Sequence, residues 1–267
     1  MIKILIIGKR GFLGNSLYNY LKKNNHVKQI GFKNLNKFKK NINKNNYIIN
    51  TSINKNYIKK KYNEKFDNDL KISKLINENK TSYIFLSTRK IYKSIENIKE
   101  NSKLSPKINY SKNKLITEKK LIKKFNTNII ILRISNIIGD RSSFKKLHST
   151  FVDIFFRNIK KGFIIDNKKD FKDFIGIDKF CEIIHKIIQK KLKGIYNVSI
   201  GKKIYLNEII SWLNRYNKKK NLIKDKVVID NDNFYLNNDK LMSKIKISNT
   251  KNNLKKFCLK LSKKKFT

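Results

Sequence analysis

Short apolar runs alternate with longer amphipathic stretches along the first half of the chain. Residues 2–7 form an apolar run, strand-like runs lie at 27–32, 47–50, 83–86 and 129–132, and helical patterns lie near 66–79 and 110–125. A further helical pattern begins near residue 12, where Leu13, Leu17, Tyr20 and Leu21 share one face. Strands and helices that alternate at these lengths predict a parallel sheet with helices on both of its faces.

The second half of the chain mixes helical patterns with shorter strands. Helices are predicted near 148–161, 178–191, 205–216 and 250–262, strands at 163–166, 194–198 and 226–230, and loops at the Asn/Lys-rich stretches 33–46 and 217–224. No linker rich in Gly, Pro or Ser divides the chain, and no internal repeat is present. We therefore expect an α/β fold: a Rossmann-type, doubly wound domain with a smaller interleaved C-terminal substrate lobe. The domain would comprise residues 1–135, continued by 172–200, and the lobe residues 136–171 and 201–267.

Composition fits a folded protein that lies in the cytoplasm. Of 267 residues, 39% are hydrophobic and 11% aromatic, which is too apolar for a disordered chain. No apolar run approaches the roughly 18 residues that a membrane span needs, and the apolar start of the chain is interpreted as a strand rather than a signal peptide. Cys181 and Cys258 lie on apolar helical stretches without metal-ligand spacing, which predicts buried, reduced thiols and no metal site.

A formal net charge of +45 would by itself suggest a nucleic-acid or membrane partner. However, the basic residues are nearly all lysines spread along the chain, and the chain has no alanine and one proline, which is typical of A/T-rich coding. We therefore expect no specific nucleic-acid partner. The few arginines and glycines that persist against this bias are the more informative residues.

Three of the nine glycines lie within seven residues, between the first strand and the first helix. A Gly-x-x-Gly-x-x-Gly loop in this position predicts dinucleotide binding, because it combines a tight turn, close backbone approach to a pyrophosphate and a helix N-terminus. The expected cofactor contacts in the loop are Gly8, Arg10, Gly11, Phe12, Leu13 and Gly14.

The exits of the second and third strands bear on the choice of cofactor. NAD-preferring sites usually carry an acid at the end of the second strand, and this chain has Gly31, Phe32 and Lys33 there. Arg10 and Lys33 would instead meet a 2′-phosphate, which favours NADP(H), with NAD(H) possible. The alternative is that both side chains simply face solvent. Asn50, at the end of the third strand, is a further expected cofactor contact.

Thr88, Tyr110 and Lys114 form the candidate catalytic set. Tyr110 and Lys114 are four residues apart at the start of a helix, so they share one face. A phenol has an unperturbed pKa of about 10, which a nearby ammonium lowers. A hydroxyl at Thr88 can orient the phenol and a substrate carbonyl, so that a proton passes while hydride moves to or from a nicotinamide. Other Tyr-x-x-x-Lys pairs occur in this chain, and only order and spacing distinguish this one.

Six segments in order resemble the extended short-chain dehydrogenase/reductases, a family of nucleotide-sugar epimerases, dehydratases and reductases. They are residues 8–14 (GxxGFLG), 87–92 (S-S/T-x-x-V-Y), 106–114 (P-x-x-x-YxxxK), 132–139 (LRxxNxxG), 172–178 (RDFIHVD) and 194–198 (GxYNV). The resemblance implies that Thr88, Tyr110 and Lys114 are catalytic and that Lys114 also holds the cofactor ribose. It further implies that Asn136 contacts a nucleotide-sugar substrate, and we expect Arg141 to meet the nucleotide phosphates with it. His148 lies near the family's acid/base His and is a further expected substrate contact; the alternative is a solvated histidine at the start of a helix.

Departures from the family pattern narrow the reaction. The family's 4,6-dehydratases carry Asp-Glu after the catalytic Thr, whereas this chain has Arg89 and Lys90, which argues against dehydration. Arg10 resembles the loop of GDP-fucose synthase-type enzymes, and the short run between the second and third strands resembles dTDP-4-dehydrorhamnose reductases. We expect a 4-keto-sugar reductase or epimerase of surface polysaccharide biosynthesis, which by analogy forms a homodimer through the 110–125 helix. The alternative is a non-catalytic member of the fold that binds NAD(P) or RNA.

Overall fold

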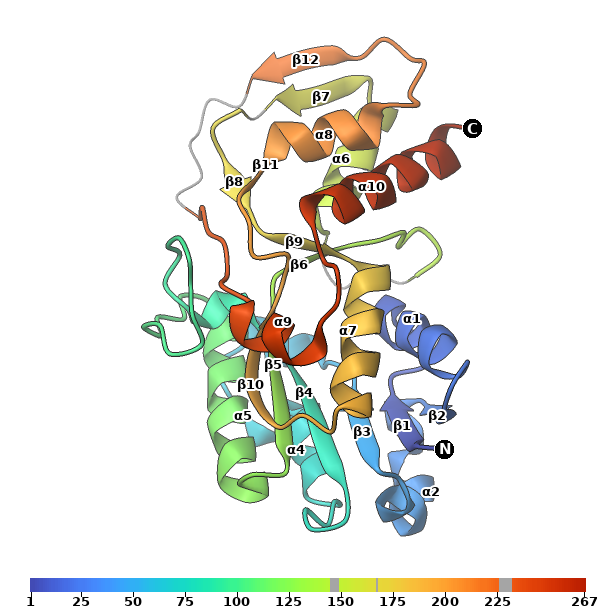
Figure 1. Ribbon diagram of the computed structural model, residues 1–267, viewed down its shortest axis with the longest axis vertical. Coiled ribbons are helices and arrows are strands. Elements are labelled where there is room, and N and C mark those ends of the chain that lie inside the picture. The colour runs from blue at the N-terminus through green and yellow to red at the C-terminus, as the bar shows by residue number, and fades with distance from the viewer. Residues whose placement is uncertain (145–148, 167, 226–231) are drawn as a thin grey trace.

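A parallel sheet forms the centre of the computed structural model, which describes residues 1–144, 149–166, 168–225 and 232–267 (Figure 1). Its six described strands have the order β10-β5-β4-β3-β1-β2 and are all parallel. They are β1 (Lys3–Ile7), β2 (His26–Ile30), β3 (Tyr47–Asn50), β4 (Ser82–Thr88), β5 (Ile129–Ile134) and β10 (Gly194–Val198). The predicted Rossmann-type α/β fold is confirmed.

Helices cover both faces of the sheet because its strands are apolar on both sides. The helices α1 (Phe12–Leu21) and α7 (Ile177–Gln189) lie on one face, and α4 (Asn68–Ser73) and α5 (Asn109–Phe125) on the other (Figure 1). Along β1, Ile4 and Ile6 join the core beneath α1 and α7, whereas Leu5 and Ile7 join the core beneath α4 and α5.

A second group of elements lies beyond the carboxyl ends of the strands (Figure 1). Its strands pair as β6 (Asn136–Ile138) with β9 (Phe174–Gly176), β7 (Phe163–Asp166) with β12 (Leu222–Asp225), and β8 (Phe171–Lys172) with β11 (Ile204–Tyr205). Its helices are α6 (Phe151–Lys160), α8 (Leu206–Asn214) and α10 (Lys251–Phe266). They share a separate apolar core that includes Phe155, Trp212 and Leu254. We call this group the C-terminal lobe; the exact residue bounds of the two predicted units stay a prediction.

The chain returns from this lobe to the sheet near its end. Residues 234–238 run toward β10, and α9 (Asp239–Ile245) packs beside β10 and α7. The buried Asp173 carboxylate fixes this return, because it accepts hydrogen bonds from the backbone N–H groups of Ile200, Gly201 and Leu236 at 3.0–3.2 Å. Neither α9 nor the short α3 (Lys55–Lys59) is among the predicted elements.

Three predictions of local structure are wrong. The stretch 33–46 is not a loop but forms η1 (Phe32–Asn34), α2 (Leu35–Phe38) and η2 (Lys39–Lys44), because Leu35 and Ile42 insert into the core. The predicted loop at 217–224 includes the start of β12, which pairs in parallel with β7. The helix predicted at 66–79 is only α4, whose start is fixed by the Asp67 side chain accepting from Leu70 N. The strand predicted at 226–230 lies outside the described residues.

A buried polar network joins β4, β5, β10 and α5. It contains residues from three of the segments that resemble the family, 87–92, 132–139 and 194–198. The Arg133 guanidinium on β5 forms an ion pair with Glu118 on α5 and donates to the Tyr92 hydroxyl at 2.8 Å. Tyr92 in turn donates to Asn197 on β10 at 2.9 Å. Arg133, Tyr92 and Asn197 therefore hold the sheet together rather than line a site. No helix among the described residues is long and apolar enough to cross a membrane.

Candidate active site

The glycine loop follows β1 at the point where the strand order reverses. Chain order runs from β1 to β2 on one side and then to β3 on the other, so the carboxyl ends of β1 and β3 form the switch point at which open α/β sheets bind their ligands. Gly8 has φ +130°, and a Cβ there would lie 2.2 Å from Thr51 Oγ1; a Cβ on Gly14 would lie 2.1 Å from Gly8 O. Only glycine fits these two positions.

Gly11 differs from its neighbours in the loop. A Cβ built on Gly11 would have no described atom within 4 Å, so this part of the loop borders open space. Gly11 is also the N-cap of α1, and no side chain caps the N–H groups of the ten-residue helix. An uncapped helix N-terminus beside a tight glycine turn fits the pyrophosphate of a dinucleotide. Phe12 and Leu13, the first two residues of α1, are half-buried.

The other expected cofactor contacts lie at the exits of β1, β2 and β3. Arg10 and Lys33 are both exposed and follow the neighbouring parallel strands β1 and β2. Asn50, at the end of β3, is buried, and its amide donates to Asp69 Oδ1 at 2.8 Å and to Ser52 O at 3.1 Å. The Asn50 side chain is thus bonded within the protein, and direct contact of all three residues with a cofactor stays a prediction.

The predicted catalytic residues come from β4 and α5, which pack against each other. Thr88 ends β4, is 8% exposed, and its hydroxyl accepts a hydrogen bond from Lys90 N at 3.3 Å. Tyr110 is half-buried in the first turn of α5, and Lys114 follows one turn later on the same face. The catalytic roles of these residues stay a prediction.

Lys114 is almost fully buried. Its Nζ lies 4.4 Å from the centroid of the Phe85 ring and 3.4 Å from Asp69 Oδ2 on α4. Burial lowers the pKa of Lys114, but the charges of Asp69, Tyr110 and Asp67 together outweigh burial and leave that pKa above its ordinary value. The helix face beside Tyr110 therefore presents a permanent cation, the group that a catalytic phenol needs to form a phenolate at neutral pH.

Comparison with protein families identifies the chain. Residues 51–199, more than half of the chain, match the model of the NAD dependent epimerase/dehydratase family. The chain belongs to this family. A search of curated proteins found no match.

Solved structures show the same fold at low sequence identity. A dTDP-4-dehydrorhamnose reductase from Clostridium acetobutylicum is 16% identical with a TM-score of 0.78, and each chain covers 100% of the other. The enzyme WbmH from Bordetella bronchiseptica in complex with NAD⁺ is 15% identical, with a TM-score of 0.80 and the same coverage. A UDP-N-acetylglucosamine 4-epimerase from Methanobrevibacter ruminantium in complex with UDP-N-acetylmuramic acid is 17% identical, with a TM-score of 0.78 and coverage of 98% and 97%.

In this epimerase/dehydratase family member, Arg89 follows Thr88 and is held by the C-terminal segment. Its guanidinium forms two hydrogen bonds with the Asp232 carboxylate, and its Cζ lies 3.7 Å from the centroid of the Phe234 ring. Lys172 Nζ lies 3.4 Å from the same carboxylate. Burial raises the pKa of Asp232, but the hydrogen bonds and charge of Arg89 outweigh burial and hold that pKa well below its ordinary value. Arg89 is therefore held in a charge-paired contact with the C-terminal segment beside Thr88.

The three predicted substrate contacts have different outcomes. Asn136 begins β6 and donates from its amide to Asp173 O at 3.1 Å. Arg141 forms an ion pair with Asp153 at 3.2 Å, at the start of α6. His148 lies outside the described residues. Substrate contacts by all three stay predictions.

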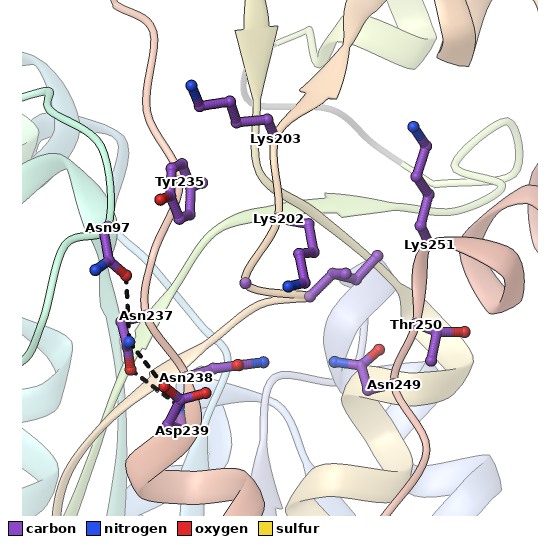
Figure 2. Close-up of a pocket in the computed structure, with 12 residues that line it drawn as sticks. Asn97, Lys202, Lys203, Tyr235, Asn237, Asn238, Asp239, Asn249, Thr250 and Lys251 are labelled. Carbon is purple, nitrogen blue, oxygen red and sulfur yellow. Dashed lines mark hydrogen bonds between the residues drawn. The ribbon is translucent and has the colours of Figure 1, made fainter.

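A cavity of about 690 Å³ lies apart from these residues (Figure 2). It is lined by Asn97 and by residues 200–203, 235, 237–239 and 249–251, so neither Thr88 nor the Tyr110–Lys114 pair borders it. Its lysines are partly neutralised, because Lys203 pairs with Glu96 at 2.7 Å and Lys251 with Glu208 at 2.5 Å. The candidate active site therefore lies at the carboxyl ends of the strands and not in this cavity.

Asp69 is the site residue that the sequence patterns do not identify. It lies 45 positions before Lys114 and within a stretch interpreted only as part of a helix. The one signal in the sequence is the scarcity of acidic residues. The chain has only 19 of them, and two, Asp67 and Asp69, lie at the start of α4 beside apolar residues. Such a pair in a lysine-rich chain indicates a need for buried negative charge. The described residues hold no group of three or more metal-ligating side chains.

Proposed function

We propose that this chain is an NAD(P)-dependent oxidoreductase that reduces or epimerises a nucleotide-linked 4-keto sugar. The proposal rests on two features that both lie at the carboxyl ends of the parallel strands. The glycine loop meets the reversal of strand order, and the Tyr110–Lys114 face of α5 packs beside β4, which ends in Thr88. A dinucleotide site next to a phenol–ammonium pair supports hydride transfer coupled to proton transfer.

Each residue of the set has a separate task in this proposal. Bound NAD(P)H supplies the hydride. Tyr110 donates its phenolic proton to the carbonyl oxygen of the sugar during reduction, and the phenolate left behind is stabilised by the Lys114 ammonium. Lys114 also holds the nicotinamide ribose hydroxyls, and the Thr88 hydroxyl orients the carbonyl. An epimerase would start instead from oxidised cofactor and a sugar with a C4 hydroxyl. Tyr110, as the phenolate, would take the hydroxyl proton as hydride leaves C4, and would return a proton to the 4-keto sugar when hydride comes back on its other face.

The pairing of Arg89 supports reduction or epimerisation over dehydration. Elimination of water needs an acid or base beyond Tyr110 near the reacting carbons. The positions after Thr88 that supply such groups in the resembling dehydratases hold Arg89 and Lys90, and Arg89 is bonded to Asp232. A guanidinium does not lose its proton in a protein.

We further propose that NADPH is preferred over NADH. The exits of β1 and β2 present Arg10 and Lys33 to solvent, and no acid follows β2 to bind ribose hydroxyls. Two cations at this edge favour a 2′-phosphate. Replacing Arg10 by Gln is expected to weaken NADPH binding by about tenfold while NADH binding is unchanged.

The cellular setting of the reaction follows from the family resemblance. We infer a homodimer formed through α5, a cytoplasmic location and a role in supplying sugars for surface polysaccharides. Ile108 and Ile122, before and on α5, are 49% and 38% exposed, which supports α5 as the dimer surface. Sedimentation of the purified protein measures whether it is a dimer.

The test is a titration of the protein with NADPH and NADH, followed by nicotinamide absorbance in the presence of UDP-, GDP- and dTDP-linked 4-keto sugars. Net oxidation of NADPH by one sugar establishes a reductase, and tight binding with sugar interconversion but no net oxidation establishes an epimerase. The absence of cofactor binding, together with salt-sensitive RNA binding, would instead favour the non-catalytic alternative.

Tyr110→Phe separates catalysis from cofactor binding. It is expected to lower kcat by at least about 100-fold with cofactor affinity unchanged. The matched control is Tyr18→Phe, since Tyr18 and Lys22 form another Tyr-x-x-x-Lys pair with the Lys22 Nζ 5.0 Å from the ring centroid. Turnover that survives Tyr110→Phe, or falls equally in Tyr18→Phe, contradicts the mechanism.

A further inference from the structure

The proposed catalytic lysine occupies an environment that opposes its charge. Lys114 is 6% exposed, and its ammonium lies between the rings of Phe85 and Tyr57, at 4.4 and 5.9 Å from their centroids. Transfer of an ammonium from water to such a site favours the neutral amine and can lower the pKa of a buried lysine by several units. A neutral amine at Lys114 would not stabilise a phenolate on Tyr110. Something in the chain must therefore hold the proton on Lys114.

The Asp69 carboxylate is built into the site as the partner of Lys114. Asp69 is 5% exposed, and its Oδ2 lies 3.4 Å from Lys114 Nζ. Its other oxygen, Oδ1, accepts hydrogen bonds from the Asn50 amide and the Tyr83 hydroxyl, both at 2.8 Å. Asn50 is oriented in turn, because its Oδ1 accepts from the Ser52 hydroxyl at 2.6 Å. The carboxylate cannot rotate away from Lys114 without losing both of these donors.

We propose that Asp69 is a positioning residue that keeps Lys114 protonated and directed along α5 toward Tyr110. The proposal rests on the proposed function, because it assigns Asp69 a role through the catalytic lysine. It also assigns a role to Asn50, which fixes Asp69 from the end of β3. The exit of the strand beside the glycine loop is thereby connected to the proton-transfer pair through Asn50, Asp69 and Lys114.

The other groups that face Lys114 support this assignment. Asp67, the N-cap of α4, accepts from the Thr117 hydroxyl at 2.6 Å and the Tyr62 hydroxyl at 3.0 Å, and acts on Lys114 through its charge alone. Among the described residues near Lys114, Tyr110 on α5 and Tyr57 on α3 are phenols, and Tyr83 on β4 reaches the site through its hydrogen bond to Asp69; burial raises the pKa of Tyr57 and of Tyr83. Asp69 is thus the anion in direct contact with the ammonium.

Asp69→Asn removes the charge and retains the shape. The oxygen of the amide still accepts from Asn50 and Tyr83, but its NH₂ group now faces the Lys114 ammonium. Lys114 is then expected to lose its proton in the folded protein at a pH well below the roughly 10.4 of an unfolded lysine. In the wild type it stays protonated in both states across the neutral range.

The decisive measurement is the free energy of unfolding in urea between about pH 6 and pH 9.5, for the wild type and Asp69→Asn. Where folded Lys114 is neutral and unfolded Lys114 is charged, the unfolded state binds one more proton, so stability rises with pH. The unfolding constant of Asp69→Asn relative to the wild type is therefore expected to fall with rising pH, by up to about tenfold per unit, which is about 1.4 kcal/mol. A ratio that is the same at every pH overturns the proposal.

The double variant Asp69→Asn/Lys114→Met identifies the titrating group. It is expected to abolish the added pH dependence, because no buried lysine remains; persistence of that dependence overturns the proposal. If Asp69→Asn does not fold near neutral pH while the double variant does, the unpaired ammonium is the cause and the proposal holds. If neither variant folds, Asp69 serves the fold independently of Lys114 and the proposal fails. The conservative variant Asp69→Glu is expected to keep the wild-type pH profile.

These measurements use no substrate, so they can fail or succeed independently of the proposed function. Turnover supplies the functional readout once a keto sugar is identified. The kcat for NADPH-dependent reduction by Asp69→Asn is expected to fall at least about tenfold below the wild type near pH 8 and to approach it near pH 6, as Lys114 regains its proton. A loss of kcat that is equal at both pH values indicates a purely structural effect and contradicts the role of Asp69 in catalysis.

Discussion

The buried ion pair between Arg133 and Glu118 gives the sharpest prediction of stability. Their side chains are only 5% and 2% exposed, and the pair lies within a network in which Ser87 donates to Glu118 at 2.9 Å and Arg133 donates to Tyr92 at 2.8 Å. Glu118→Gln preserves the volume and leaves the Arg133 charge in the core without a counter-ion. Breaking one side of a buried pair typically costs about 3–5 kcal/mol. The variant should lose that much of its free energy of unfolding.

Urea unfolding followed by the fluorescence of Trp212 measures this loss. The control is Lys120→Met, which breaks the pair between Lys120 and Glu64 on the protein surface, where solvent screens both charges, and should change stability little. Replacing both buried partners, as Glu118→Leu with Arg133→Met, should cost less than Glu118→Gln alone, because no unpaired charge remains. If Glu118→Gln and Lys120→Met have the same small effect, the network does not hold the sheet in the way inferred here.

Two further predictions concern the glycine loop and the thiols. Gly14→Ala should weaken NADPH binding at least about tenfold and lower Tm, because its Cβ would lie 2.1 Å from a backbone carbonyl of the loop. Gly162→Ala, between α6 and β7, should lower Tm because Gly162 has φ +83°, but should leave NADPH binding unchanged; equal effects on binding in a fluorescence titration would contradict the geometry. Cys181 and Cys258 are buried and free, and burial raises the pKa of each thiol to about 12, so neither should react with a water-soluble disulfide reagent until urea is added. Rapid reaction of the native protein would show that one of the thiols is accessible.

The sequence predicts the sheet well because its central strands, such as β1, β3 and β5, are mostly apolar and buried along their length. It predicts the Lys114 face of α5 because a spacing of four residues is local to one helix. The same reasoning fails at 33–46, because the many Asn and Lys residues there suggest a loop. Leu35 and Ile42 are nevertheless buried, because they pack into the core beside the sheet. Short strands such as β6, three residues long, pair through partners that are distant in the chain and carry no period of their own.

In the candidate site, too, the contacts between residues close in sequence were predictable, and those between distant residues were not. The glycine turn and the Tyr110–Lys114 spacing are local, and both are found in the expected elements. The contacts of Asp69 with Lys114 and of Asp232 with Arg89 join residues 45 and 143 positions apart. No sequence period specifies such pairs, because they depend on how α4 and the C-terminal segment pack after the fold has formed.

The return of the chain to Asp173 has a consequence for how the protein is made. The Asp173 carboxylate has all of its backbone hydrogen bonds only when the N–H of Leu236 reaches it. The Asn197 amide on β10 likewise donates to Asn237 O at 3.0 Å. The ribosome has therefore released every strand of the sheet well before the residues that fix its edge strand emerge. Folding of the nascent chain can start at β1, but β10 is fixed only after residues 236 and 237 have been synthesised, so this edge strand docks later than the rest of the sheet.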